Sequence, residues 1–195
     1  MRNIMLFIAV AVFSLSNVSA QERDKGVIEI IPYLGYSSFF LNGDEVEQLD
    51  SRASLSFGVK GDYYFNDRWS LRSGLTYDAM GASVPKSDLK LDYLNIPVNV
   101  NWHFGSTRKW NLNFGVTPGF LMKADIDGDD VKDFYKSFQL GISYGIGYKL
   151  EISESFSLLF DSQGFFGVTN ILEESDNFTR LNAGSNLNIG GVFTF

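Results

Sequence analysis

The chain of 195 residues has no cysteine, one histidine, four prolines and no long apolar run after its N-terminus. The absence of cysteine excludes disulfides, thiol catalysis and cysteine-ligated metals. A single histidine makes His103 an obligatory member of any histidine-based catalytic pair. Beyond the first 20 residues no stretch approaches the roughly 20 apolar residues that a spanning helix needs, so any membrane-spanning structure has to be a closed barrel of strands.

The N-terminus has the features of an export signal. Arg2 precedes an apolar run from Ile4 to Phe13, and Val18-Ser19-Ala20 precedes Gln21, which is typical of a secretory signal peptide with a small-x-small cleavage site. We therefore expect residues 1–20 to be removed, leaving one domain, 21–195, with 15 basic and 23 acidic residues and a net charge of −8. Such an acidic exported chain is a poor candidate for binding nucleic acid.

Period-two alternation is what the sequence has in abundance. From Phe138 to Leu150 every second residue is large and apolar, and small or polar residues such as Gln139 and Lys149 fill the gaps. This pattern is typical of a strand with one apolar face. It predicts eight strands, at 27–40, 54–65, 69–78, 91–104, 110–124, 137–152, 156–167 and 181–195.

The connections and the volume of the apolar side chains favour a membrane barrel over a soluble one. Eight strands with a large residue at every second position carry more bulk than the interior of an eight-stranded barrel can hold, so these residues should face lipid. Short turns face the periplasm in such barrels and long loops face outside. The sequence therefore predicts an all-β fold, an eight-stranded antiparallel transmembrane β-barrel integral to the outer membrane. Its short periplasmic turns are 66–68, 105–109 and 153–155, and its longer extracellular loops are 41–53, 79–90, 125–136 and 168–180.

The opposite face of the strands predicts a polar, plugged lumen. Five acidic and four basic side chains nearly balance there: Glu29, Asp62, Asp78, Glu151 and Asp161 against Lys60, Arg72, Lys123 and Lys149. If 66–68 is a three-residue turn, Asp62 lies directly across from Arg72, close enough for an ion pair. We expect an ion network in the lumen made of Asp62, Arg72, Lys60, Lys149 and Asp161.

Catalytic and metal sites are not indicated. His103 should point into the lumen near the periplasmic end, where a lipid substrate cannot reach it, so we expect no enzyme activity. One loop resembles the opening of a calcium-binding loop, because carboxylates alternate around Gly128, but it has no acidic residue at the closing position. A solvated acidic loop is the favoured interpretation, a weak divalent site is the alternative, and no cofactor is expected. The carboxylates concerned are Asp125, Asp127, Asp129, Asp130 and Asp133.

Four stretches resemble the PorT-like family of small outer-membrane barrels from Bacteroidetes: Tyr93 to Val98, Phe114 to Leu121, Gly141 to Leu150 and Gly167 to Ile171. The resemblance covers essentially the mature chain. It implies fold and location, and it implies no activity, because the family has no common catalytic residues. One branch of the family has an accessory role in secretion. The terminal Phe195 is similar to the residue with which outer-membrane barrels end as a signal for the barrel assembly machinery.

Two functions stay open on these grounds. The first is a structural or interaction barrel with loops presented to the cell exterior, whose partners would be outer-membrane lipid, lipopolysaccharide, the assembly machinery and an unidentified protein. The alternative is a narrow pore for small solutes or an accessory component of a secretion system. A pore would need a lumen lined by one sign of charge or left open by glycine.

Overall fold

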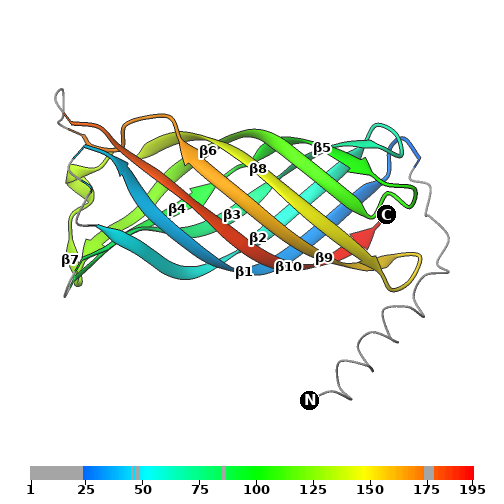
Figure 1. Cartoon of the computed structure of the whole chain (residues 1–195), viewed down its shortest axis with the longest axis horizontal. Coiled ribbons are helices and arrows are strands. Elements are labelled where there is room, and N and C mark those ends of the chain that lie inside the picture. Colours follow the sequence, from blue (N-terminus) through cyan, green and yellow to red (C-terminus); the bar gives the residue numbers. More distant parts are fainter. Residues whose placement is uncertain (1–23, 45, 47–48, 85–86, 174–177) are drawn as a thin grey trace, which may run out of the picture.

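The computed structural model describes residues 24–44, 46, 49–84, 87–173 and 178–195. The expected signal peptide, residues 1–20, lies outside them. None of the described residues belongs to a helix that could cross a membrane. They form one antiparallel sheet that closes on itself as an elongated barrel (Figure 1).

The described strands occupy eight positions around the ring. Strands β4 and β5 share one position, since both pair with β3 and β6, and the short β7 pairs only with β6. The strands are β1 (Ile28–Gly43), β2 (Asp50–Tyr64), β3 (Trp69–Val84), β4 (Ser87–Asn95), β5 (Val98–Phe104), β6 (Trp110–Ile126), β7 (Asp129–Asp130), β8 (Phe138–Glu151), β9 (Phe156–Gly167) and β10 (Arg180–Thr194), with a 3₁₀ turn η1 (Lys132–Phe134) after β7.

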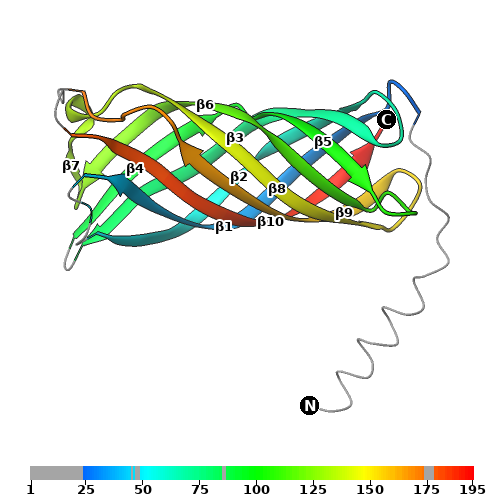
Figure 2. The same ribbon diagram turned by 45° about the horizontal axis from the view of Figure 1, so that its top comes forward.

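Strands β1 and β10 close the barrel. Tyr33 lies opposite Gly190 along this seam. At its end the N–H of Ile28 donates to the carbonyl of Phe195 at 3.2 Å, and the N–H of Phe195 donates to the carbonyl of Ile28 at 2.9 Å. Figure 2 shows the two strands side by side and steeply tilted against the long axis. Because each spanning strand among the described residues pairs with a neighbour on both sides, these strands leave no open sheet edge toward the surroundings.

Large apolar side chains cover the outside of the barrel. Successive residues of a strand point to opposite faces, so on β1 Leu34 is 60% exposed while its neighbour Tyr33 is buried. Such an outer surface is stable against lipid and not against water. Other exposed members of this apolar wall are Leu55, Phe57, Val59, Leu71, Leu75, Val100, Leu112, Phe114, Val116, Ile142, Tyr144, Ile146, Phe160, Leu187 and Ile189.

Aromatic rings gather at the end of the barrel that carries the short turns. Trp69 and Trp102 have ring centroids 6.3 Å apart, Trp102 and Phe104 5.1 Å, and Phe104 and Trp110 6.4 Å. Aromatic girdles of this kind lie at the membrane–water interface, where an amphipathic ring meets both lipid and headgroups. Because such girdles flank both interfaces, the short turns decide the orientation, and we assign this end, where the C-terminus also lies (Figure 1), to the periplasm.

Two predicted loops are largely strand. In the predicted loop 41–53, residues 41–43 belong to β1 and 50–53 to β2, and in the predicted loop 79–90, residues 79–84 belong to β3 and 87–90 to β4. The predicted fourth strand, 91–104, begins at Ser87 and is divided around Pro97. Proline has no N–H to donate to the ladder, so the pairing with β3 is interrupted between Asn95 and Val98.

What we call the extracellular extension comprises residues 50–54, 79–84, 87–93 and 121–130, which are the added strand segments together with the adjoining ends of the predicted strands. Here the polarity is reversed at several positions: Asp92 pairs on the outside with Lys123 of β6, while Leu91 and Tyr93 are buried inside. Met122, at the register shift of β6, stays exposed. The interior holds a cluster that we call the apolar plug, made of Phe39, Leu41, Met80, Ala82, Leu91, Tyr93, Leu121, Ala124, Phe165 and Ile171.

Candidate functional site: the packed lumen

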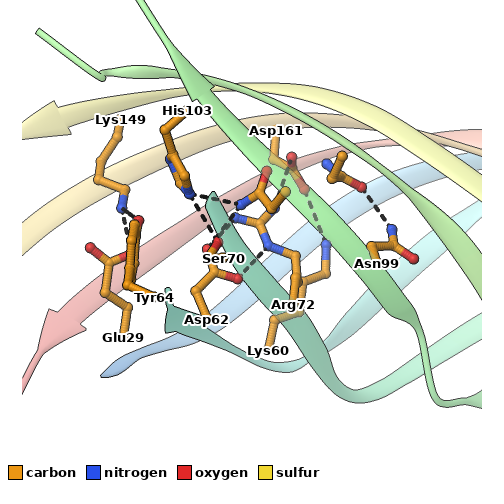
Figure 3. A network of polar contacts seen from close by, with 12 residues as sticks. Glu29, Lys60, Asp62, Tyr64, Ser70, Arg72, Asn99, His103, Lys149 and Asp161 are labelled. Carbon is orange, nitrogen blue, oxygen red and sulfur yellow. Dashed lines mark hydrogen bonds and ion pairs between the residues drawn. The ribbon is translucent and has the colours of Figure 1, made fainter. Parts of the chain in front are cut away.

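The β2–β3 hairpin sets the geometry of the lumen network. The N–H of Phe65 donates to the carbonyl of Trp69 at 2.8 Å, and counting back from this turn pairs Asp62 with Arg72. Arg72 binds the carboxylate with two parallel bonds, Nε to Oδ1 at 2.7 Å and Nη2 to Oδ2 at 2.8 Å (Figure 3). Both residues are 1% exposed. Bidentate geometry of this kind is the strong form of the carboxylate–guanidinium contact.

Asp161 links this pair to the opposite wall of the barrel. It lies on β9, and its carboxylate is 3.7 Å from Nη1 of Arg72 and 3.1 Å from Nζ of Lys60. Nε2 of Gln163 donates to it at 2.7 Å. The ammonium of Lys60 also lies 4.4 Å from the ring centroid of Tyr33, a cation–π contact. Four of the five residues expected in the network therefore meet in one cluster across the lumen (Figure 3).

Lys149 belongs to a neighbouring cluster. Its ammonium donates to Oε2 of Glu29 and, at 3.1 Å, to the hydroxyl of Tyr64, which in turn donates to Glu29 at 3.1 Å. The ring of Tyr64 lies 4.8 Å from that of His103. Every carboxylate in the two clusters thus meets a cation, and the lumen is lined by both signs of charge.

His103 is enclosed by polar neighbours on β3 and β5. It is 1% exposed, with Nε2 2.9 Å from Oγ of Ser70 and 3.3 Å from Nδ2 of Asn101. Asn101 also donates to Asp62 at 3.1 Å. The histidine is therefore part of the packed lumen and lies on the opposite face of the sheet from the lipid.

Asparagine side chains do much of the remaining bonding, although none of them is among the residues expected in the ion network. The buried Asp78 accepts from Nδ2 of Asn95 at 2.7 Å, from Nδ2 of Asn186 at 2.9 Å and from Oγ1 of Thr76 at 3.2 Å. Nδ2 of Asn99 donates to Asn113 at 2.7 Å. The signal that could have found them is their place in the alternation, since each lies on the inward face of its strand.

The prediction that Lys123 points into the lumen is wrong. Its side chain is 63% exposed and binds Asp125 at 2.8 Å on the outside of the extracellular extension. The register against β4 shifts between Asp92 and Tyr93, which pair with Lys123 and Leu121 and leave Met122 extra. Such a β-bulge inserts one residue and moves the following side chains to the other face.

The lumen is also not polar along its whole length. A cavity of about 50 Å³ lies between Lys60 and Arg72 on one side and Phe39, Met80 and Phe165 on the other. This volume exceeds the roughly 10–15 Å³ that a single water needs, so the cavity can hold water. The apolar plug lies beyond the cavity and closes the extracellular half.

The acidic loop uses its carboxylates locally. Asp125 binds Lys123 and lies 3.7 Å from Nζ of Lys90. Asp127 accepts from Oγ of Ser87 at 2.7 Å, and Asp130 accepts from the N–H of Lys132 at 2.9 Å. Among the described residues, which include Asp129 and Asp133, no group of three or more possible metal ligands comes together.

Phe195 lies at the periplasmic rim. Its side chain is 78% exposed, and its backbone completes the seam with Ile28.

Comparison with known proteins identifies the family. Residues 19–173 match the model of the outer membrane protein beta-barrel domain. The chain belongs to this family. Its members are outer-membrane barrels, and the chain is accordingly an integral protein of the outer membrane. A comparison with curated protein sequences finds no match.

Solved structures agree with the barrel fold. OprG from Pseudomonas aeruginosa matches with a TM-score of 0.53 and 14% identity, covering 88% of this chain and 97% of that one. Neisserial surface protein A matches with a TM-score of 0.55 and 16% identity, covering 88% and 100%. The N-terminal barrel of OprF from Pseudomonas aeruginosa matches with a TM-score of 0.50 and 14% identity, covering 90% and 100%. At these identities the likeness concerns the fold alone.

Proposed function

We propose that this outer-membrane barrel is a non-conducting, non-catalytic protein that presents its extracellular end to a partner. The observation that carries the proposal is the closed lumen: a cross-linked ion network, a cavity of about 50 Å³ and the apolar plug follow one another along the axis. With its interior filled, the surfaces left for function are the lipid-facing wall and the two ends. His103, the single histidine, lies in the packed interior.

The proposal also includes the roles that the sequence suggests for the two ends of the chain, for its family branch and for its partners. Residues 1–20 act as the export signal, and Phe195 is read by the barrel assembly machinery. The resemblance to PorT-like barrels of Bacteroidetes supports membership of that branch and makes a protein of a secretion system one candidate partner. Lipopolysaccharide surrounds the extracellular extension, where Lys90 and Lys123 face outward.

Planar-bilayer recording of the refolded protein tests the closed lumen. We expect no unitary conductance, because the mixed charges and the apolar plug give ions no hydrated path. A positive control replaces both barriers, with Phe39→Ala, Asp62→Ala and Arg72→Ala in one chain, after heat-modifiable gel mobility has shown that it folds. Reproducible unitary steps from the wild-type protein would overturn the proposal in favour of a narrow pore.

Single introduced cysteines test which end of the barrel faces the cell exterior. They are specific probes because the chain has no cysteine. Asp133→Cys should react with an impermeant maleimide on intact cells, and Glu154→Cys should react only after the outer membrane is opened. The reverse pattern would invert the topology. A pull-down from gently solubilised outer membranes, with a variant carrying charge reversals at Lys90 and Lys123, then asks whether a partner depends on the extension.

A further inference from the structure

The outer mouth of the barrel contains a pocket of about 270 Å³ that is distinct from the lumen cavity. It lies on top of the apolar plug, with which it shares Leu41. The loops after β7 and β9 form part of its wall, and they meet where Tyr135 bridges Leu172. Its aliphatic lining comprises Leu41, Leu49, Leu89, Ile126 and Leu172, and its polar lining comprises Ser87, Tyr135 and Arg180.

Arg180 gives this apolar pocket a positive charge. Its backbone is fixed on both sides, because its N–H donates to Oδ1 of Asn170 at 2.9 Å and its carbonyl accepts from the N–H of Ile171 at 3.0 Å. In the part of the chain that the structure describes, Nε of Arg180 is buried without a hydrogen-bond partner and no carboxylate pairs with the guanidinium. A guanidinium surrounded by leucine side chains is stabilised by an anion whose oxygens accept hydrogen bonds from its N–H groups.

The other polar groups of the pocket are compatible with an anion. Ser87 at the rim donates to Asp127, which also accepts from the N–H of Asp88 at 3.3 Å, so that carboxylate already has partners. Burial raises the pKa of Tyr135, so its phenol stays protonated at neutral pH and can donate a hydrogen bond. Donors and apolar walls together suit a ligand with one anionic head and an apolar chain.

We propose that the mouth pocket binds the free anion of a medium-chain fatty acid, with its carboxylate on Arg180 and its chain along the leucines. The volume lies just below the roughly 300–1,000 Å³ of most small-molecule sites, which suits a single chain and excludes a lipid with several. The inference does not depend on whether the lumen conducts, because the pocket lies on the outer side of the apolar plug.

Photo-crosslinking tests the proposal on the mature chain refolded into nanodiscs. A diazirine derivative of decanoic acid is the probe, and the labelled residues are mapped by mass spectrometry. We expect saturable labelling around Leu89 and Leu172 that decanoate displaces at least about tenfold better than 1-decanol, because only the carboxylate forms charge-assisted bonds with Arg180. This comparison uses the wild-type protein and does not depend on any variant folding.

Two matched variants test whether Arg180 supplies the positive charge that favours decanoate over decanol. Arg180→Gln should abolish the preference for decanoate over decanol, whereas Lys132→Gln removes an equal charge from an exposed residue outside the pocket and should leave the preference intact. Equal competition by the two compounds, or labelling confined to the lipid-facing wall, would overturn the proposal. Conductance recordings that showed an open lumen would overturn the proposed function and leave this site standing.

Discussion

The spanning part and the extracellular extension are made of the same strands and have opposite polarity. In the spanning part Val59 faces out while Lys60 and Arg72 face in, and in the extension Asp92 faces out while Leu91 faces in. The period of two is common to both, because it comes from the pleat of the strand. The surroundings decide which face is apolar. In the spanning part apolar side chains face outward and contact lipid, and in the extension they face inward and are buried away from water.

The two regions are consequently stabilised by different interactions. The interior of the spanning part is held by ion pairs and hydrogen bonds in a narrow space, where an unpaired charge is costly. The interior of the extension is held by burial of Met80, Leu91 and their neighbours, as in a soluble protein. Variants that act on one region and not the other test this division.

The largest effect is expected from Arg72→Met. It leaves the buried carboxylate of Asp62 without its cation, and breaking a buried pair in this way typically costs about 3–5 kcal/mol. Asp62→Asn should be similar in size, and the double variant should lose clearly less than the sum of the two. The measurement is a urea unfolding midpoint of refolded protein for each of the four chains. Additive losses would show that the two side chains do not interact.

A charge on the outer surface should separate the two environments. Val59→Arg places a cation midway along the apolar wall, where such changes cost about 2–4 kcal/mol, and near or beyond the interface the cost falls to roughly 0–1 kcal/mol. Ala53→Arg is the matched control, because Ala53 is exposed in the extension and pairs with Ser38 in the same unbroken register against β1 in which Val59 pairs with Pro32, so the two residues share one face of β2. Unfolding in lipid vesicles gives both values. Equal losses would mean that the extension is also embedded in lipid.

Truncation inside the apolar plug should have a smaller and more local effect. Leu91 is fully buried, and Leu91→Ala should cost about 2–3 kcal/mol, toward the lower end of the range for a leucine in a core. Hydrogen exchange should accelerate in β4 and the adjoining part of β6 and stay unchanged at the Asp62 cluster. Equal acceleration at both ends would mean that the barrel has one cooperative interior.

The smallest effect concerns the charged outside of the extension. The bond from Lys123 lowers the pKa of Asp125, so its contribution to stability is present above the unfolded pKa and is lost as the pH falls through the folded one. Lys123→Gln should therefore raise the pKa of Asp125 in an NMR titration. Lys132→Gln, which removes an equal charge that is not bonded to Asp125, should change it less. The same shift of the Asp125 pKa in both variants would mean that the pKa depends on the total charge of the region and not on the bond with Lys123.

The sequence predicts the strands of the spanning part better than those of the extracellular extension. Strands with an outward apolar face were recognised, and the predicted strand 156–167 has the bounds of β9. The sequence predicts a loop at 79–90, because the criterion for a strand is an apolar outer face and these residues lack one. Alternation alone also cannot show the bulge at Met122, and so Lys123 was placed on the wrong face.

Among the lumen contacts, those between neighbouring strands can be predicted from the sequence, and those that cross the lumen cannot. The short turn fixes the register of β2 against β3, so the position of Asp62 opposite Arg72 follows from counting residues. The contact of Asp161 with Lys60 and Arg72 runs across the lumen between strands that are not neighbours in the ring. It depends on the tilt and stagger of the closed barrel, which no short stretch of sequence specifies.

The seam between β1 and β10 has a consequence for how the molecule folds. Tyr33 and Gly190 pair although nearly the whole chain separates them, and contacts of such high contact order form slowly, because a long loop must close before they contribute. Until they form, β1 and β10 are open edges that can pair with other chains. The chain is therefore most exposed to aggregation just before closure, and a binding protein that holds its C-terminal strand would act at the step that limits the yield of folded barrel.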